Sequence, residues 1–74
     1  NEQFQEDMFL LIQEQLMKAP SNQLGQYAER TMEVLNKKHL NPLIETLESR
    51  REDVTNEYHI KRLNKNLIKL YKQL

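Results

Sequence analysis

Helix-breaking residues are rare in this chain, and their positions limit its possible folds. Pro20 and Pro42 are the two prolines, and Gly25 is the single glycine among 74 residues. Leu, Glu, Gln, Lys and Arg are abundant and favour helix, whereas only nine residues are Val, Ile or Thr, which favour strands. The sequence therefore predicts an all-α fold whose helices are separated near the two prolines.

The prolines and nearby capping residues divide the chain into predicted helices. The α region is disfavoured for the residue before a proline, and Ser or Asn can cap the next helix, so one helix ends near residue 18 and another begins near residue 22. Proline is favoured in the first turn of a helix, which places a further start at Pro42 after Asn41. We expect helices at residues 2–18, 22–39, 42–53 and 55–74.

The segment after Pro42 is compatible with two architectures. On one continuous helix, Leu43 and Leu47 would share a side, whereas Ile60 and Leu63 would begin a stripe about half a turn away. Either the helix breaks within residues 53–56, where capping residues gather, or one helix runs about 50 Å and needs another chain to cover it. The break is favoured. The predicted fold is a small bundle of three or four helices that forms a dimer, with a long C-terminal helix as the alternative.

The small size of the chain favours association with a partner. Below about 70 to 80 residues, a hydrophobic core seldom contributes more than about 3 to 5 kcal/mol, and such domains gain stability from disulfides, metals or partner chains. The sequence has no cysteine, and its two histidines, His39 and His59, are far apart in the chain. We therefore predict a non-enzymatic protein-interaction module that acts as a homodimer or as a small regulatory or scaffolding subunit.

The predicted interface consists of the apolar residues that remain after packing within the chain. Those of the first helix form a wide arc, and those of the last helix alternate three and four residues apart, like the a and d positions of a coiled coil. The predicted interface residues are Phe4, Met8, Phe9, Ile12, Ile60, Leu63, Leu67, Leu70 and Leu74. Gly25, in the first turn of the second helix, is expected to permit close packing on a neighbouring helix.

Charge is distributed unevenly, although eleven basic residues balance eleven acidic ones. Residues 58–74 contain five basic residues and no acidic one, whereas residues 1–20 contain four acidic residues and one lysine. The five cations share one face of the last helix and are Lys61, Arg62, Lys65, Lys69 and Lys72. Such a face is usually solvated, but it also indicates an alternative function, nucleic-acid binding, since cations release counterions from phosphates. An anionic membrane surface or a groove of another protein is a third alternative.

Residues suited to catalysis do not form a recognisable motif in the sequence. Glycine-rich phosphate loops, nucleophile elbows and His-Glu-x-x-His are absent, so we expect no catalytic residues, no metal, no cofactor and no enzymatic activity. His39 and His59 are expected to have capping or surface roles, and Arg50 and Arg51 to join a local salt-bridge cluster. The longest apolar run, residues 8–12, is too short to span a membrane, and an intracellular, cytoplasmic location is expected.

Overall fold

Four α-helices and three short 3-10 turns follow one another along residues 2–74, the part of the chain that the computed structural model describes. The helices are α1 (Glu2–Lys18), α2 (Leu24–Glu33), α3 (Leu40–Arg50) and α4 (Glu57–Tyr71). The turns are η1 (Ser21–Gln23), η2 (Lys37–His39) and η3 (Arg51–Asp53). No strand occurs among these described residues, and the predicted all-α fold is confirmed with four helices.

The chain leaves helical geometry before α4, as the cluster of capping residues predicts. Val54 and Asn56 have extended backbones, with ψ angles of 115° and 128°. The Asn56 side chain accepts a hydrogen bond from the backbone N–H of His59 at 3.2 Å and so caps the first turn of α4. The alternative of one continuous helix after Pro42 is therefore wrong, and α4 is a separate helix.

The segment between α2 and α3 differs from the prediction, which continued the second helix to His39. α2 ends at Glu33, and Asn36 is extended, with φ −100° and ψ 154°, before the turn η2. This turn places the His39 ring against Phe9 of α1, with ring centroids 3.9 Å apart. A local contact, the hydrogen bond from the Asn36 N–H to His39 Nδ1, and the stacking of His39 on Phe9 both accompany this early end of α2. Pro42 lies in the first turn of α3, where a missing N–H breaks no helical hydrogen bond.

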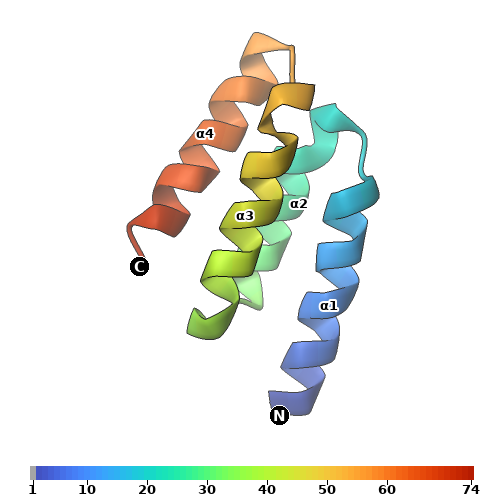
Figure 1. Cartoon of the computed structure of the whole chain (residues 1–74), viewed down its shortest axis with the longest axis vertical. Helices are drawn as coiled ribbons and strands as arrows, with labels where there is room; N and C mark the ends of the chain where they lie inside the picture. Colours follow the sequence, from blue (N-terminus) through green and yellow to red (C-terminus); the bar gives the residue numbers. More distant parts are fainter. Residues whose placement is uncertain (1) are drawn as a thin grey trace.

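The helices alternate in direction and form two antiparallel hairpins, α1 with α2 and α3 with α4 (Figure 1). α1 packs mainly on α2 and α3, and α4 packs mainly on the same two helices. α1 and α4 therefore lie at opposite edges of the bundle (Figure 1). Each of these two helices keeps an outer side that faces away from the core.

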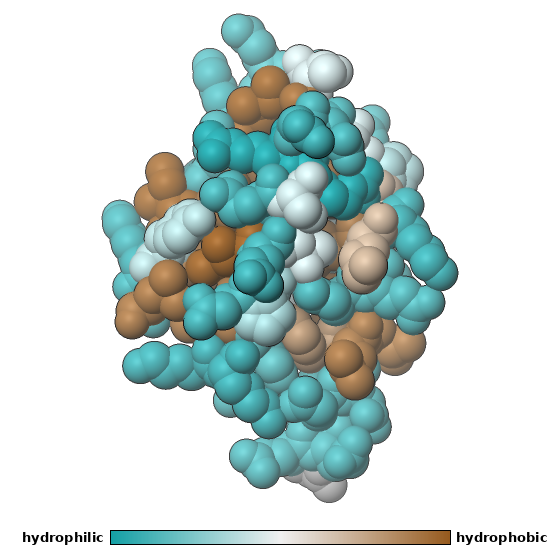
Figure 2. Space-filling view, viewed as in Figure 1, coloured by the Kyte–Doolittle hydropathy of each residue, from teal (hydrophilic) through white to brown (hydrophobic). Residues whose placement is uncertain are grey.

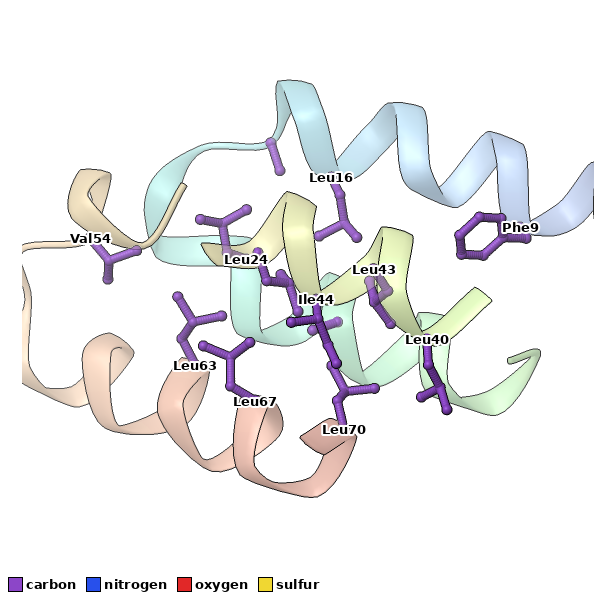
Figure 3. Close-up of a cluster of buried hydrophobic side chains, with 13 residues drawn as sticks. Phe9, Leu16, Leu24, Leu40, Leu43, Ile44, Val54, Leu63, Leu67 and Leu70 are labelled. Atoms are coloured by element: carbon purple, nitrogen blue, oxygen red, sulfur yellow. The ribbon is translucent and has the colours of Figure 1, made fainter. Parts of the chain in front are cut away.

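Thirteen buried apolar side chains form one core between the helices (Figure 3). Leucines dominate it, and Leu16, Leu24, Leu43, Leu47 and Leu70 are fully shielded from solvent. The other members are Phe9, Ala19, Ala28, Leu40, Ile44, Val54, Leu63 and Leu67. The inner leucines of α4 are thus covered by helices of the same chain.

Substitution of leucines near the C-terminus should separate core from surface positions. We expect Leu70→Ala, at a fully buried position, to lower the free energy of unfolding by about 2 to 5 kcal/mol because it leaves a cavity. Leu74→Ala, at a position that is 60% exposed, should change it by less than about 0.5 kcal/mol. Denaturant unfolding followed by circular dichroism measures both variants. Equal effects of the two substitutions would contradict this core.

Candidate functional site

The structure divides the predicted interface residues between the core and the surface. Four of the nine lie in the core: Phe9, Leu63, Leu67 and Leu70. Three are half-buried, Met8, Ile12 and Ile60, and of these Ile60 packs against the core. Two are exposed: Phe4 and Leu74. The middle of the α4 stripe is therefore covered by α2 and α3 instead of being left for a second chain, and only its last residue is open to solvent.

The solvent side of α4 combines lysines with exposed apolar side chains. Lys61, Lys65 and Lys72 line a shallow groove of about 410 Å³ together with Ile68, whose exposed fraction is 55%. The half-exposed Tyr71 extends the apolar part towards α3. We call this surface the α4 outer face and define it by Tyr58, Lys61, Lys65, Ile68, Lys69, Tyr71 and Lys72.

Arg62 does not join these lysines, although the sequence places it among them. Its Nε and Nη2 atoms donate to the two carboxylate oxygens of Glu29 on α2, at 2.9 and 2.7 Å. Asn66, one turn further along α4, donates from Nδ2 to Glu29 Oε2 at 3.1 Å and to the Gly25 carbonyl at 3.2 Å. We call these four residues the α2–α4 clasp. The charge of Arg62 is thus already paired within the chain.

The α2–α4 clasp depends on charge and on close approach of the two helices. The hydrogen bonds from Arg62 and Asn66 lower the pKa of Glu29 from its ordinary value of 4.5 to about 2, and the Glu29 carboxylate raises the pKa of Arg62. Gly25 leaves room for this contact, because a Cβ atom at this position would lie only 2.9 Å from Cγ of Arg62. The predicted role of Gly25 in close helix packing is confirmed.

The solvent side of α1 also carries large apolar side chains, but acidic residues accompany them. Leu10, Leu11 and Met17 are each more than half exposed. Asp7 and Glu14 are exposed as well and lie within about 60° of Leu10 around the helix axis. We call this surface the α1 outer face and define it by Asp7, Leu10, Leu11, Glu14 and Met17. In the space-filling view, apolar groups interrupt the hydrophilic surface on both sides, where α4 and α1 lie (Figure 2).

Polar contacts from α3 fix the position of α1. Arg50 donates from Nη1 to the carbonyl of Leu16 at 2.9 Å and to the carbonyl of Ala19, and so satisfies acceptors at the C-terminal end of α1. Gln13, in the middle of α1, donates from Nε2 to Thr46 Oγ1 at 2.6 Å. These contacts hold α1 in one orientation, with its outer face in solvent.

The local salt-bridge cluster predicted around the paired arginines also forms. Arg50 Nε lies 3.3 Å from Asp53 Oδ2, and Arg51 Nη1 lies 3.5 Å from Glu48 Oε1. Glu48 also accepts a hydrogen bond from the Tyr71 hydroxyl at 3.0 Å, which raises the pKa of Tyr71. The cluster therefore links α3 to the end of α4 in addition to neutralising charge.

His39 has a buried structural position. Its ring stacks on Phe9, its Nδ1 accepts the Asn36 N–H at 3.4 Å, and its Nε2 lies 3.1 Å from Glu6 Oε2. Glu6 also pairs with Lys38 at 2.9 Å. The hydrogen bond from Lys38 lowers the pKa of Glu6 most, and the hydrogen bond from His39 lowers it further. Because Nδ1 accepts a hydrogen bond, the ring proton directed at Glu6 lies on Nε2. His39 thus caps the turn η2, as expected, and ties it to α1.

Neither a metal site nor a membrane-spanning helix is found within residues 2–74. No three His, Cys, Asp or Glu side chains of this region come together where they could hold a metal ion. None of its helices combines the length and the apolar character needed to cross a membrane.

Sequence reasoning missed the α1 outer face and the α2–α4 clasp. The apolar arc of the first helix is wider than one buried face can be, and this width is the signal that some of Leu10, Leu11 and Met17 must remain outside. Gly25 and Glu29 are one turn apart on α2, as Arg62 and Asn66 are on α4. This matched spacing is the only local signal of the clasp, and it requires knowledge of which helices are neighbours.

In comparisons with known proteins, no protein family, curated protein or solved structure matches this chain.

Removal of the Glu29 charge tests the clasp. The pKa of Glu29 is lower in the folded chain, so its carboxylate stabilises the fold above about pH 4.5, and this stabilisation is lost as the pH falls towards 2. We expect Glu29→Gln to lower the free energy of unfolding by about 1 kcal/mol at pH 7, since solvent screens this partly exposed pair, and by less at pH 2.5. Urea unfolding at both pH values measures the difference.

The matched control for this test is Glu33→Gln, which removes an exposed carboxylate from the same helix. It should change the free energy of unfolding by less than about 0.5 kcal/mol at either pH. An effect of Glu29→Gln that is the same at pH 2.5 and pH 7 would show that the Glu29 charge does not stabilise the fold.

Proposed function

We propose that this chain is a non-enzymatic protein-interaction module that acts by self-association or as a small regulatory or scaffolding subunit. The location of its exposed apolar residues carries the proposal. Among residues 2–74, the large apolar side chains that are highly exposed lie on α1, on α4 or just beyond α4, and they are Phe4, Leu10, Leu11, Met17, Tyr58, Ile68, Tyr71 and Leu74. Apolar surface gathered in this way is typical of protein interaction sites.

The two remaining helices have the opposite surface character. The exposed residues of α2 and α3 are all polar, and they are Gln26, Arg30, Glu33, Asn41, Glu45, Glu48 and Ser49. The exposed apolar groups on α1 and α4 lie outside the core, and about half or more of the surface of each remains in contact with water. A partner that covers the α1 or the α4 outer face would remove this unfavourable contact, which supports an interaction role for these two helices.

Sedimentation velocity at increasing protein concentration tests self-association. We expect the average mass of the wild-type chain to rise with concentration, and its thermal stability to rise in parallel. Leu10→Gln combined with Met17→Gln should lower this average mass because it removes apolar surface from the α1 outer face. Gln26→Ala, at an exposed polar position on α2, should leave it unchanged. A chain that stays monomeric at every concentration would contradict self-association.

Nucleic-acid binding through the α4 outer face is a second candidate function. Four exposed lysines have no acidic partner within salt-bridge distance in the described part of the chain: Lys61, Lys65, Lys69 and Lys72. Unpaired cations on one side of a helix favour phosphate contact. Ile68 and Tyr71 beside the lysines, and the pairing of Arg62 with Glu29, favour a protein partner as the first candidate.

Titration with duplex DNA and single-stranded RNA at several salt concentrations tests this second candidate. If all four lysines contact phosphates of duplex DNA, the logarithm of the affinity should fall with the logarithm of the salt concentration, with a slope of roughly −3 to −4. Lys65→Gln combined with Lys69→Gln should reduce that slope by about 2. Absence of binding at low salt would reject the candidate.

A further inference from the structure

We propose that the α1 outer face of one copy of this chain binds the α4 outer face of a second copy, so that molecules associate head to tail. The inference rests on the proposed self-association and names the two surfaces that carry it. Three observations support it: the opposite charge of the two faces, the similar arrangement of their apolar residues, and their location at opposite edges of the bundle.

The two faces carry opposite charge. Asp7 and Glu14 make the α1 outer face acidic. Lys18 lies 3.1 Å from Glu14, but both side chains are more than half exposed, and such a pair within one helix contributes little and gives way easily to a partner. The α4 outer face carries four lysines, and the nearest arginine, Arg62, is already held by Glu29. Opposite charge on two surfaces speeds their encounter and selects their orientation.

The apolar residues of each face flank its charged residues. On α1, Asp7, Glu14 and the Lys18 that pairs with Glu14 lie between Leu10 and Leu11, whose positions are separated by about 100° around the helix. On α4, Lys61, Lys65 and Lys72 lie between Ile68 and Tyr58, whose positions are separated by about 80°. Both surfaces therefore place charged side chains between two apolar ones, and on α4 Lys69 lies about 20° beyond Tyr58. The groove at Ile68 offers an apolar site for a leucine of the partner copy.

The positions of α1 and α4 determine the kind of contact. Both helices direct their buried residues to the same core from opposite edges of the bundle, so their outer faces point away from each other (Figure 1). The two faces therefore cannot meet within one chain. A two-fold dimer that used both at once would need them on the same side of the molecule. The contact between copies is heterologous, and repeated contacts lead to a ring or a longer row of molecules.

Exchange of the charges between the two faces tests the contact. The first variant reverses the α1 outer face with Asp7→Lys and Glu14→Lys, and the second reverses the α4 outer face with Lys61→Glu, Lys65→Glu and Lys72→Glu. Each variant alone presents two faces of like charge, and its self-association should be at least about tenfold weaker than that of the wild type. An equimolar mixture presents opposite charges again, and association should return. Sedimentation velocity measures all samples, and circular dichroism checks that each variant is folded.

The matched control for the first variant is Glu33→Lys with Glu45→Lys, which makes the same change in net charge as that variant, but on the polar sides of α2 and α3. Its self-association should stay within about threefold of wild type at moderate salt. If the wild type associates and the two reversed variants associate equally well, the head-to-tail contact is wrong, whereas self-association stands. If the variants fail to associate in the mixture, the pairing of these two faces is also wrong. A monomeric wild type would overturn self-association and, with it, the head-to-tail contact.

Discussion

The contact between α4 and α2 joins the second helical hairpin to the first, and the remaining arrangement follows from it. A single hairpin of this length cannot bury its own apolar side, so each pair of helices is stable only against the other. Inside the contact, Leu63 and Leu67 complete the core. At its margin, Glu29 receives three hydrogen bonds from α4, and Gly25 leaves room for the stem of Arg62. These contacts set the rotation of α4, and that rotation directs its lysines to solvent.

α1 is held from the other side by polar and stacking contacts in addition to its buried Phe9 and Leu16. Arg50 satisfies carbonyls at its C-terminal end, and His39 stacks on Phe9 near its N-terminal end. Because both ends are held by α3 and the turn before it, α1 keeps a fixed orientation although two of its three leucines, Leu10 and Leu11, stay outside the core. The bundle thus presents an acidic and apolar surface at one edge and a basic and apolar surface at the other.

The two types of cation on α4 are used differently. Arg62 has a planar guanidinium that can donate to both oxygens of one carboxylate, and it lies where two helices meet. The lysines carry flexible, strongly hydrated charges, and they lie where only solvent or a partner can reach them. One helix therefore stabilises the fold with one side and presents cationic charge to solvent with the other. This division supports a protein that works through its surface.

Local signals in the sequence were sufficient for the all-α class, the end of α1 near Pro20 and the break before α4, because a proline and a capping Asn56 act within one helical turn. They were also sufficient to identify Leu63, Leu67 and Leu70 as one apolar stripe, though not to decide whether this chain or another covers it. Packing in three dimensions alone settled the pairing of Arg62 with Glu29 and the exposure of Leu10. Each of these depends on a neighbour distant in the chain, and helix propensity and periodicity carry no information about such neighbours.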